Sequence, residues 1–193
     1  MPPKTKYTKG DIVQAAFEIA QEEGFAAITA RSVAAKLGCS VAPIYVNFET
    51  IDDLAAAVMQ RVNAISASIL AQQSGKSPFE NLGKASLQFA REYPVLVREL
   101  ILKPNPHLAN YEAVDEALVA GLADDEELRA WSDDERRKLV FVMRAFQTGL
   151  MVLLANGHVP KWLGPDEAEN LLMSTGADLV IAGNHKRNGG NIR

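Results

Sequence analysis

The sequence contains few of the residues that build disulfides, metal sites and aromatic clusters. Its 193 residues include one cysteine and three histidines, and only 7% are aromatic. The single cysteine, Cys39, excludes an internal disulfide and a multi-cysteine zinc site. The histidines His107, His158 and His185 are too far apart in sequence to form a metal-binding motif. We therefore expect neither a structural metal nor any other cofactor.

The chain also lacks a large excess of charge and a long apolar run. Its formal net charge is −4, so a surface that binds nucleic acid must be local. No uninterrupted run of about 18 apolar residues is present. The basic start MPPKTKYTKG is not followed by the apolar core of a signal peptide. We therefore expect a cytoplasmic protein that does not interact with a membrane.

Motifs of the common enzyme classes are missing as well. The sequence has no glycine-rich phosphate loop, no nucleophile elbow and no pair of carboxylates in catalytic spacing. The acidic stretch 124–127 is most simply the exposed start of a helix, where carboxylates favour the helix dipole. A cation site is the alternative for this stretch. We expect no enzymatic activity.

Helix signals are abundant, whereas the alternation typical of strands is absent. Gly24 and Gly38 are suited to end two short helices, and Pro94 divides a later segment into two helices or one kinked helix. Seven positions carry signals for helix starts: Thr8, Thr29, Ser40, Thr50, Ser77, Ser132 and Gly164-Pro165. We predict an all-α protein.

A shift in helix length near residue 60 divides the chain. Residues 1–50 are predicted to form a three-helix N-terminal domain, and the helix at 51–70 is the connector. Residues 71–184 are predicted to form a larger helical body. The remaining residues, 185–193, have no apolar period and are expected to be disordered.

The stretch GCSVAPIYVNF, residues 38–48, has the spacing of the turn and second helix of a helix-turn-helix. At about 100° per residue, Ile44 and Phe48 share an inward face, with Val41 beside them, and Val46 points away from it. Ala42 and Pro43 lie on the outer side with Val46. Tyr45 and Asn47 lie on the two flanks.

A small apolar outer face suits the major groove of DNA, where side chains such as Val46 pack on thymine methyl groups. Tyr45 and Asn47 are positioned for phosphates, Arg31 for a guanine, and Lys4, Lys6 and Lys9 for the DNA backbone. The predicted DNA contacts are Lys6, Lys9, Thr29, Arg31, Ser40, Val41, Ala42, Pro43, Tyr45, Val46 and Asn47. The alternative is a poorly packed turn that another part of the chain covers.

The stretch from Asp11 to Leu54 resembles the DNA-binding domain of the TetR/AcrR family of bacterial repressors. The similarity is carried by AAFEIAQEEGF, by ITARSVAAKLGCSVAPIYVNF and by the DDL that follows. Its most specific parts are the G-x-S turn and the I-Y-x-x-F segment. Two positions differ from the family pattern. Asn47 replaces a frequent histidine or tyrosine, and Ile51 replaces a frequent lysine.

The resemblance implies a homodimer that binds an inverted-repeat operator in double-stranded DNA. It also implies a largely apolar small-molecule effector that releases the protein from DNA. By the same resemblance, Tyr45 contacts phosphate, Val41, Ala42 and Pro43 face bases, and Arg31 contacts guanine. A helical adaptor or sensor that has lost specific DNA binding is the alternative function.

The C-terminal half offers a surface for the second copy. The helix from residue 133 is apolar on two faces and must be covered on two sides. Small residues on the last helix would permit close approach of a partner. The predicted interface consists of Phe141, Thr148, Val152, Leu171, Leu172, Ser174, Ala177 and Leu179. The alternative is that both helices are buried within one subunit.

The predicted effector cavity rests on aromatic and polar residues of the same helical body. Arg144 and Gln147 are the polar candidates for orienting a ligand, because they lie on an otherwise apolar helix. For Arg144, an ion pair across the dimer is the alternative, and for the apolar candidates it is a place in the ordinary core. The predicted lining is Phe89, Tyr93, Tyr111, Met143, Arg144, Phe146 and Gln147.

Overall fold

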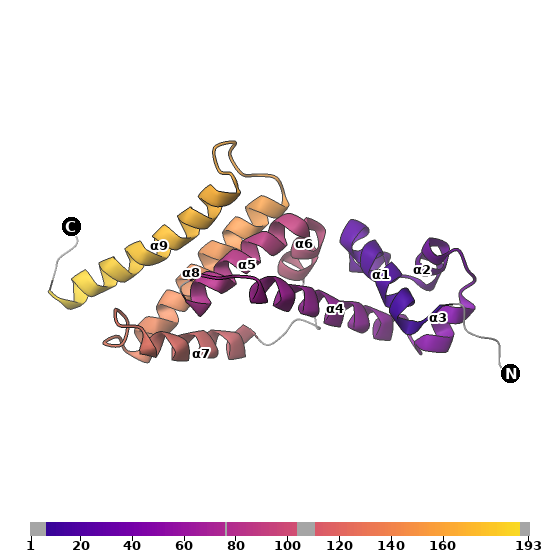
Figure 1. Ribbon diagram of the computed structural model, residues 1–193, viewed down its shortest axis with the longest axis horizontal. Coiled ribbons are helices and arrows are strands. Elements are labelled where there is room, and N and C mark those ends of the chain that lie inside the picture. The colour runs from indigo at the N-terminus through magenta and orange to yellow at the C-terminus, as the bar shows by residue number, and fades with distance from the viewer. Residues whose placement is uncertain (1–6, 76, 104–110, 190–193) are drawn as a thin grey trace. The chain divides into compact units, whose positions relative to one another are not determined.

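The structure, a computed structural model, describes residues 7–75, 77–103 and 111–189, and its regular elements are helices (Figure 1). Two short 3₁₀ turns, at Phe25–Ala27 and Leu122–Asp124, accompany the α-helices. The α-helices are α1 Lys9–Glu23, α2 Ala30–Leu37, α3 Ala42–Asn47, α4 Ile51–Ala71, α5 Pro78–Glu92, α6 Pro94–Leu102, α7 Tyr111–Gly121, α8 Asp133–Ala155 and α9 Pro165–Arg187. No strand forms within these ranges, so the all-α prediction is confirmed.

The chain divides into two compact units, and the division differs from the predicted one. One unit comprises Met1–Ser68 and Tyr93–His107, and the other comprises Ile69–Glu92 and Leu108–Arg193. Helix α6 therefore groups with the N-terminal helices, although the sequence placed it in the C-terminal body. The reason is tertiary, because α6 packs against α1.

The first unit is built around the apolar faces of its helices. Ile12, Ala16, Ile19 and Ala20 of α1 are all buried. Capping boxes at Thr8 and Thr29 fix the starts of α1 and α2, because each threonine hydroxyl accepts a hydrogen bond from a first-turn backbone N–H. The start of α6 joins this core, with the Tyr93 ring centroid 6.1 Å from that of Phe17 on α1.

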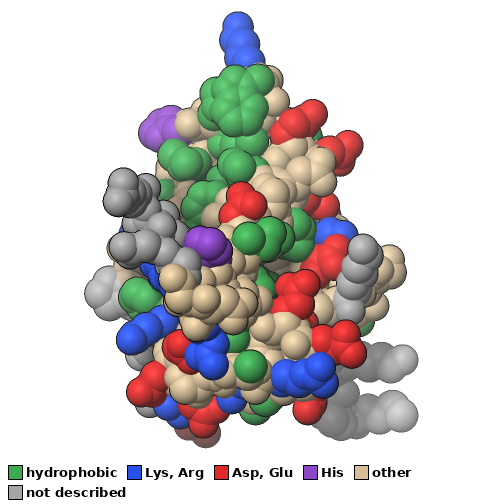
Figure 2. Space-filling view, turned by 90° about the vertical axis from the view of Figure 1, so that its left-hand side faces the viewer, with side chains coloured by type: hydrophobic (Ala, Val, Ile, Leu, Met, Phe, Trp, Pro, Cys, Tyr) green, Lys and Arg blue, Asp and Glu red, His purple; other side chains and the backbone are tan. Residues whose placement is uncertain are grey.

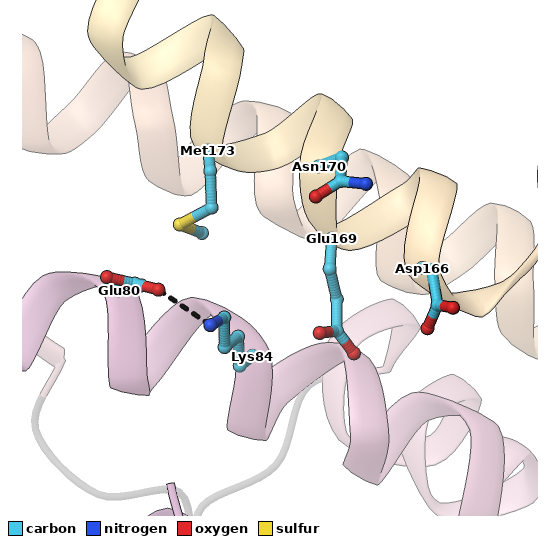
Figure 3. A pocket seen from close by; sticks show the side chains of 6 residues that line it. All are labelled: Glu80, Lys84, Asp166, Glu169, Asn170 and Met173. Atoms are coloured by element: carbon cyan, nitrogen blue, oxygen red, sulfur yellow. Dashed lines mark ion pairs between the residues drawn. The ribbon is translucent and has the colours of Figure 1, made fainter. Parts of the chain in front are cut away.

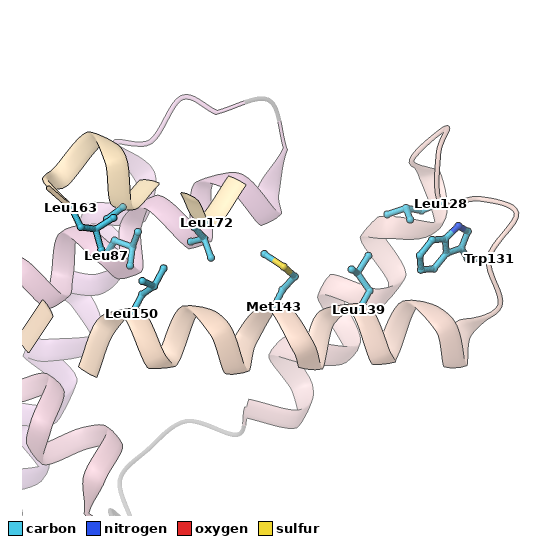
Figure 4. Packing of buried hydrophobic residues seen from close by; sticks show 9 residues of the cluster. Leu87, Leu128, Trp131, Leu139, Met143, Leu150, Leu163 and Leu172 are labelled. Carbon is cyan, nitrogen blue, oxygen red and sulfur yellow. The ribbon is translucent and has the colours of Figure 1, made fainter. Parts of the chain in front are cut away.

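The second unit has its core along one face of α8. Leu139, Met143 and Leu150 point from α8 towards the neighbouring helices, as Figure 4 shows. They belong to a cluster with Leu87 of α5 and Leu172 of α9.

Pro94 separates α5 from α6 completely. This outcome decides between the two alternatives for that segment in favour of two helices.

The C-terminal end of α9 corrects the prediction of a disordered tail from residue 185. The helix continues to Arg187, because the segment before α8 holds its last turns. Trp131 Nε1 donates to Asn184 Oδ1 at 2.7 Å, and Arg187 pairs with Glu135 at 2.6 Å. Hydrogen bonds from the Ser132 backbone and side chain, and then from Arg187, lower the pKa of Glu135 to about 2.

Two further expectations about the C-terminal half are settled differently. No α-helix begins at Asp124, because residues 125–131 form turns, in which the Glu127 backbone N–H donates to Asp125. The sequence KPNPH at 103–107 predicts a loop, and it lies outside the described residues except for Lys103. The periodicity of the sequence did not predict α7, whose residues lie between that loop and the turns.

Two helices, α4 and α8, are long and apolar enough to cross a membrane by length and composition alone. Charged residues interrupt both, which is why the sequence shows no uninterrupted apolar run. Each helix has one face in a core, as core helices of water-soluble proteins do. Only 22% of the most apolar 18-residue stretch of α8 is buried inside the chain. Much of the apolar surface of this helix is therefore open to solvent.

The contact between Gly183 and Trp131 predicts a stability change. A Cβ at Gly183 would overlap the Trp131 ring. We expect Gly183→Ala to lower the free energy of unfolding by about 1–3 kcal/mol, because the ring must move. Gly121→Ala is the control, since nothing lies within 4 Å of its Cβ position, and it should be neutral or stabilising by up to about 1 kcal/mol. Urea unfolding at fixed protein concentration checks both; equal stabilities would contradict this packing.

Candidate functional site

The turn between α2 and α3 depends on a left-handed glycine. Gly38 ends α2 with φ 66° and ψ 39°, a conformation that favours glycine. The backbone N–H of Cys39 then donates to Ala34 O at 3.0 Å. Contrary to the sequence prediction, Val41 rather than Ser40 is the N-cap residue of α3, and no side chain caps this helix. Pro43 fits the first turn, where its missing N–H needs no intrahelical acceptor.

The inward and outward sides of α3 are clearly separated. Ile44 is fully buried and Phe48 is 4% exposed, as the helical period predicted. On the other side Val46 is 73% exposed and Tyr45 is 56% exposed. Val41 is 39% exposed instead of lying beside the inward residues. The outer surface of α3 is therefore apolar and open to solvent.

Asn47 is partly engaged by its own helix. Its side-chain amide nitrogen donates to Pro43 O in the first turn of α3 at 2.8 Å. The sequence predicted a phosphate contact for this amide, whereas in the structure it bonds to the backbone. Tyr45 is thus the better placed of the two flanking residues for a contact outside the chain.

Few cations near α3 are available to a ligand. Arg31 is exposed on the first turn of α2. Lys9 Nζ lies 4.9 Å from the ring centroid of Phe48. Lys36 pairs with Glu18 at 3.2 Å and with Glu22 at 3.5 Å; the bond to Glu18 is the main cause of its raised pKa.

Other predicted contacts of this surface are only partly described. Lys4 and Lys6 lie outside the described residues. Thr29 is exposed, but its hydroxyl caps α2 by accepting from Ser32 N at 3.0 Å. Ile51 begins α4 and is half-buried, with exposed acidic residues directly after it. Arg31 is therefore the described cation best suited to contact a base.

A second candidate surface lies on α8 and α9. Phe141 and Ile181 are 61% and 65% exposed, and Val142 and Leu153 are also open to solvent. Figure 2 shows hydrophobic side chains gathered over the upper part of the molecule seen from its α9 side. An exposed apolar area of this kind is typical of a protein interface.

Most, but not all, of the predicted interface residues are accessible. Phe141, Ser174 and Ala177 are exposed. Leu172 is 1% exposed and belongs to the core of its own unit, so it offers no surface to a partner. The half-buried members of the predicted set are Thr148, Val152, Leu171 and Leu179.

The predicted cavity residues are distributed over both units. Tyr93 lies with the first unit, whereas Phe89 and Met143 are buried in the second, at 7% and 1% exposure. Arg144 pairs with Asp115 of α7 at 2.5 Å, so its partner is within the chain. The side chain of Tyr111 is outside the described residues, and Phe146 and Gln147 are half-buried.

A different crevice lies between α5 and α9, as Figure 3 shows. It encloses about 500 Å³, and sequence analysis named none of its lining residues. Lys84 pairs with Glu80 at 2.6 Å, a spacing of four residues that the sequence could have indicated. The lining residues are Glu80, Lys84, Asp166, Glu169, Asn170 and Met173.

The N-terminal segment matches a known family. Residues 12–58 fit the model of the family described as bacterial regulatory proteins, tetR family, which confirms the resemblance seen in the sequence. No curated protein sequence is significantly similar to the chain.

Solved structures share the fold over most of the chain. A TetR-like transcriptional regulator from Rhodococcus sp. RHA1 has a TM-score of 0.63 at 20% identity, covering 91% of this chain and 94% of that chain. A second regulator from Rhodococcus sp. Rha1 has a TM-score of 0.59 at 16% identity, covering 91% and 97%. The multidrug binding protein EbrR, complexed with proflavin, has a TM-score of 0.53 at 18% identity, covering 86% and 98%.

The left-handed turn predicts the effect of substitutions at Gly38. Because nothing lies within 4 Å of a Cβ there, Gly38→Ala meets no clash and should cost only the backbone strain, about 1–2 kcal/mol of unfolding free energy. Gly38→Asn should cost less, since asparagine tolerates this conformation. Gly10→Ala, within α1, is the control and should be neutral or stabilising. Thermal or urea unfolding measures the order; equal costs for alanine and asparagine would argue against the turn geometry.

Proposed function

Because residues 12–58 belong to the tetR family of bacterial regulatory proteins, we propose that this chain is a ligand-responsive transcriptional repressor. It binds an inverted-repeat operator as a homodimer and leaves DNA when a small molecule binds. The observation that carries the proposal is the open outer face of α3, with Val46 73% exposed behind a glycine turn. Adjacent exposed apolar side chains on one helix face are typical of a surface that a partner covers.

The proposed DNA contacts follow from exposure and chemistry. Ala42, Pro43 and Val46 enter the major groove, where small apolar side chains allow close approach. Arg31 donates to a guanine, and the Tyr45 hydroxyl bonds to a phosphate. Val41 also faces the bases, and the remaining proposed contacts, which position the protein on the duplex, are Lys6, Lys9, Thr29, Ser40 and Asn47.

The proposed dimer uses α8 and α9. One helix-turn-helix contacts only a few base pairs, so specific binding needs two of them about 34–36 Å apart, or a multiple of that spacing. The open apolar face of α8 supports a second copy as the partner, because a two-fold interface is self-complementary. Of the predicted interface residues, those with accessible surface are Phe141, Thr148, Val152, Leu171, Ser174, Ala177 and Leu179.

The proposed effector is a largely apolar small molecule bound in the second unit. Support comes from the shared fold with EbrR, whose structure contains proflavin. Helix α6 follows α5 directly in the chain and packs against α1 of the first unit. We propose that a shift of α6 on effector binding moves the helix-turn-helix and lowers DNA affinity.

A helical adaptor that no longer binds DNA specifically is the second candidate. It is favoured by the shortage of available cations, since Lys36 is held by two glutamates and position 51 carries isoleucine. Such a protein would retain the fold and the dimer, but it would bind duplexes weakly and without sequence preference.

Selection of bound duplexes from a random DNA pool tests the proposal. The purified protein, at near-physiological salt, is expected to enrich an inverted repeat with a guanine placed for Arg31. Absence of enrichment from a folded dimer would support the adaptor instead. The selection is repeated after unfolding and refolding, which removes any bound effector and so excludes a ligand-blocked state.

Introducing the lysine that the family often has should strengthen DNA binding. We expect Ile51→Lys to lower the dissociation constant and to steepen the slope of log affinity against log salt by about one, because one more phosphate is neutralised. Ala67→Lys adds the same charge further along α4 and should leave the slope unchanged. Fluorescence anisotropy with the selected operator at several salt concentrations measures both slopes. Equal slopes in the two variants would place position 51 away from the DNA backbone.

A charge on the open face of α8 should separate the dimer. Phe141 is 61% exposed, so Phe141→Asp should leave each subunit folded but place an unpaired carboxylate in the proposed interface. We expect monomers in sedimentation velocity at micromolar concentration. Val114→Asp is the control, since Val114 is a 42% exposed apolar residue on α7. A Phe141→Asp variant that still sediments as a dimer would exclude this face.

A further inference from the structure

The outer face of α3 lacks a side chain that could distinguish hydrogen-bond donors from acceptors. Ala42 and Val46 are four residues apart, so they lie on one side of the helix, and both are exposed. Val46 is the most exposed of the large hydrophobic residues described, at 73%. A base that faces these two side chains meets carbon atoms only.

The polar groups beside this face do not supply the missing discrimination. The hydroxyls of Ser40 and Tyr45 both donate and accept, so each bonds equally well to a carbonyl or to an amino group of a base. The bond from the Asn47 amide nitrogen to Pro43 O, at 2.8 Å, holds this side chain against its own helix. Arg31 is a directional donor, but it lies on α2 and selects a purine.

Pyrimidines differ in the major groove in two independent ways. Thymine carries a methyl group on C5 and an accepting oxygen on C4, whereas cytosine has no methyl group and carries a donating amino group on C4. Methylation of cytosine adds the C5 methyl group without changing C4. An apolar contact therefore detects the methyl group and is indifferent to the group on C4.

We propose that Ala42 and Val46 recognise the C5 methyl group of a pyrimidine, so that cytosine methylation strengthens binding at the position where thymine is favoured. This inference rests on the proposed operator binding and deepens it. It makes DNA affinity depend on the methylation state of an operator. Burial of one methyl-sized apolar group corresponds to about a fourfold gain in affinity.

Four duplexes test the inference. At each pyrimidine of one selected half-site in turn, the pair is made thymine·adenine, uracil·adenine, 5-methylcytosine·guanine or cytosine·guanine. At one position we expect about fourfold tighter binding of thymine over uracil, and the same ratio for 5-methylcytosine over cytosine. Equality of the two ratios is the signature of a methyl contact, because the two comparisons share only the methyl group.

Protein variants assign the effect to α3. Val46→Ala should bring both ratios close to one, since the contacting methyl groups of the side chain are removed. Val114→Ala, which shortens an exposed valine on α7, should leave both ratios as in the wild type. Circular dichroism verifies that Val46→Ala is folded, which its exposure favours.

Each outcome decides the matter. Equal binding of the operator with and without the methyl groups overturns this inference and leaves the proposed function standing. The same holds if thymine binds more tightly than uracil while 5-methylcytosine and cytosine bind equally. Ratios that persist in Val46→Ala overturn the assignment of the methyl contact to Val46. If no operator is enriched at all, the proposed function fails and this inference fails with it.

Discussion

Burial of Ile44 and Phe48 determines how α3 is presented. Both side chains are in the core of the first unit, so the helical period forces Val46 to the opposite side. The turn before α3 is equally constrained, because Gly38 adopts a left-handed conformation that directs the chain from α2 into α3. The apolar recognition face is thus a consequence of core packing, and the proposed DNA chemistry depends on it.

The second unit shows the same relation between a core and an open surface. One side of α8 is buried through Leu139, Met143 and Leu150, while Phe141 on another side is exposed. A subunit that buries only one of two apolar faces leaves the other for association. The open face and the helix-turn-helix support each other as parts of one function, because a dimer is what places two recognition helices on one operator.

Long-range contacts determine the parts of the structure that periodicity did not predict. Helix α6 joins the first unit because it packs against α1, which no local pattern near Pro94 indicates. The end of α9 is ordered by Asn184 and Arg187, whose partners are more than fifty residues away in the chain. Two predicted cavity residues also have partners that local periodicity does not indicate, since Tyr93 packs with Phe17 and Arg144 pairs with Asp115.

The sequence by itself determined the fold class, the helix-turn-helix and the opposite directions of Ile44 and Val46 on α3. Capping signals, turn glycines and the 3.6-residue period act within a few residues, so they can be recognised in the amino-acid sequence. Tertiary structure alone decided that Leu172 is core, that Arg144 pairs with Asp115, and that α6 accompanies α1. These features depend on which surfaces meet in space, and packing between distant segments is not encoded in local periodicity.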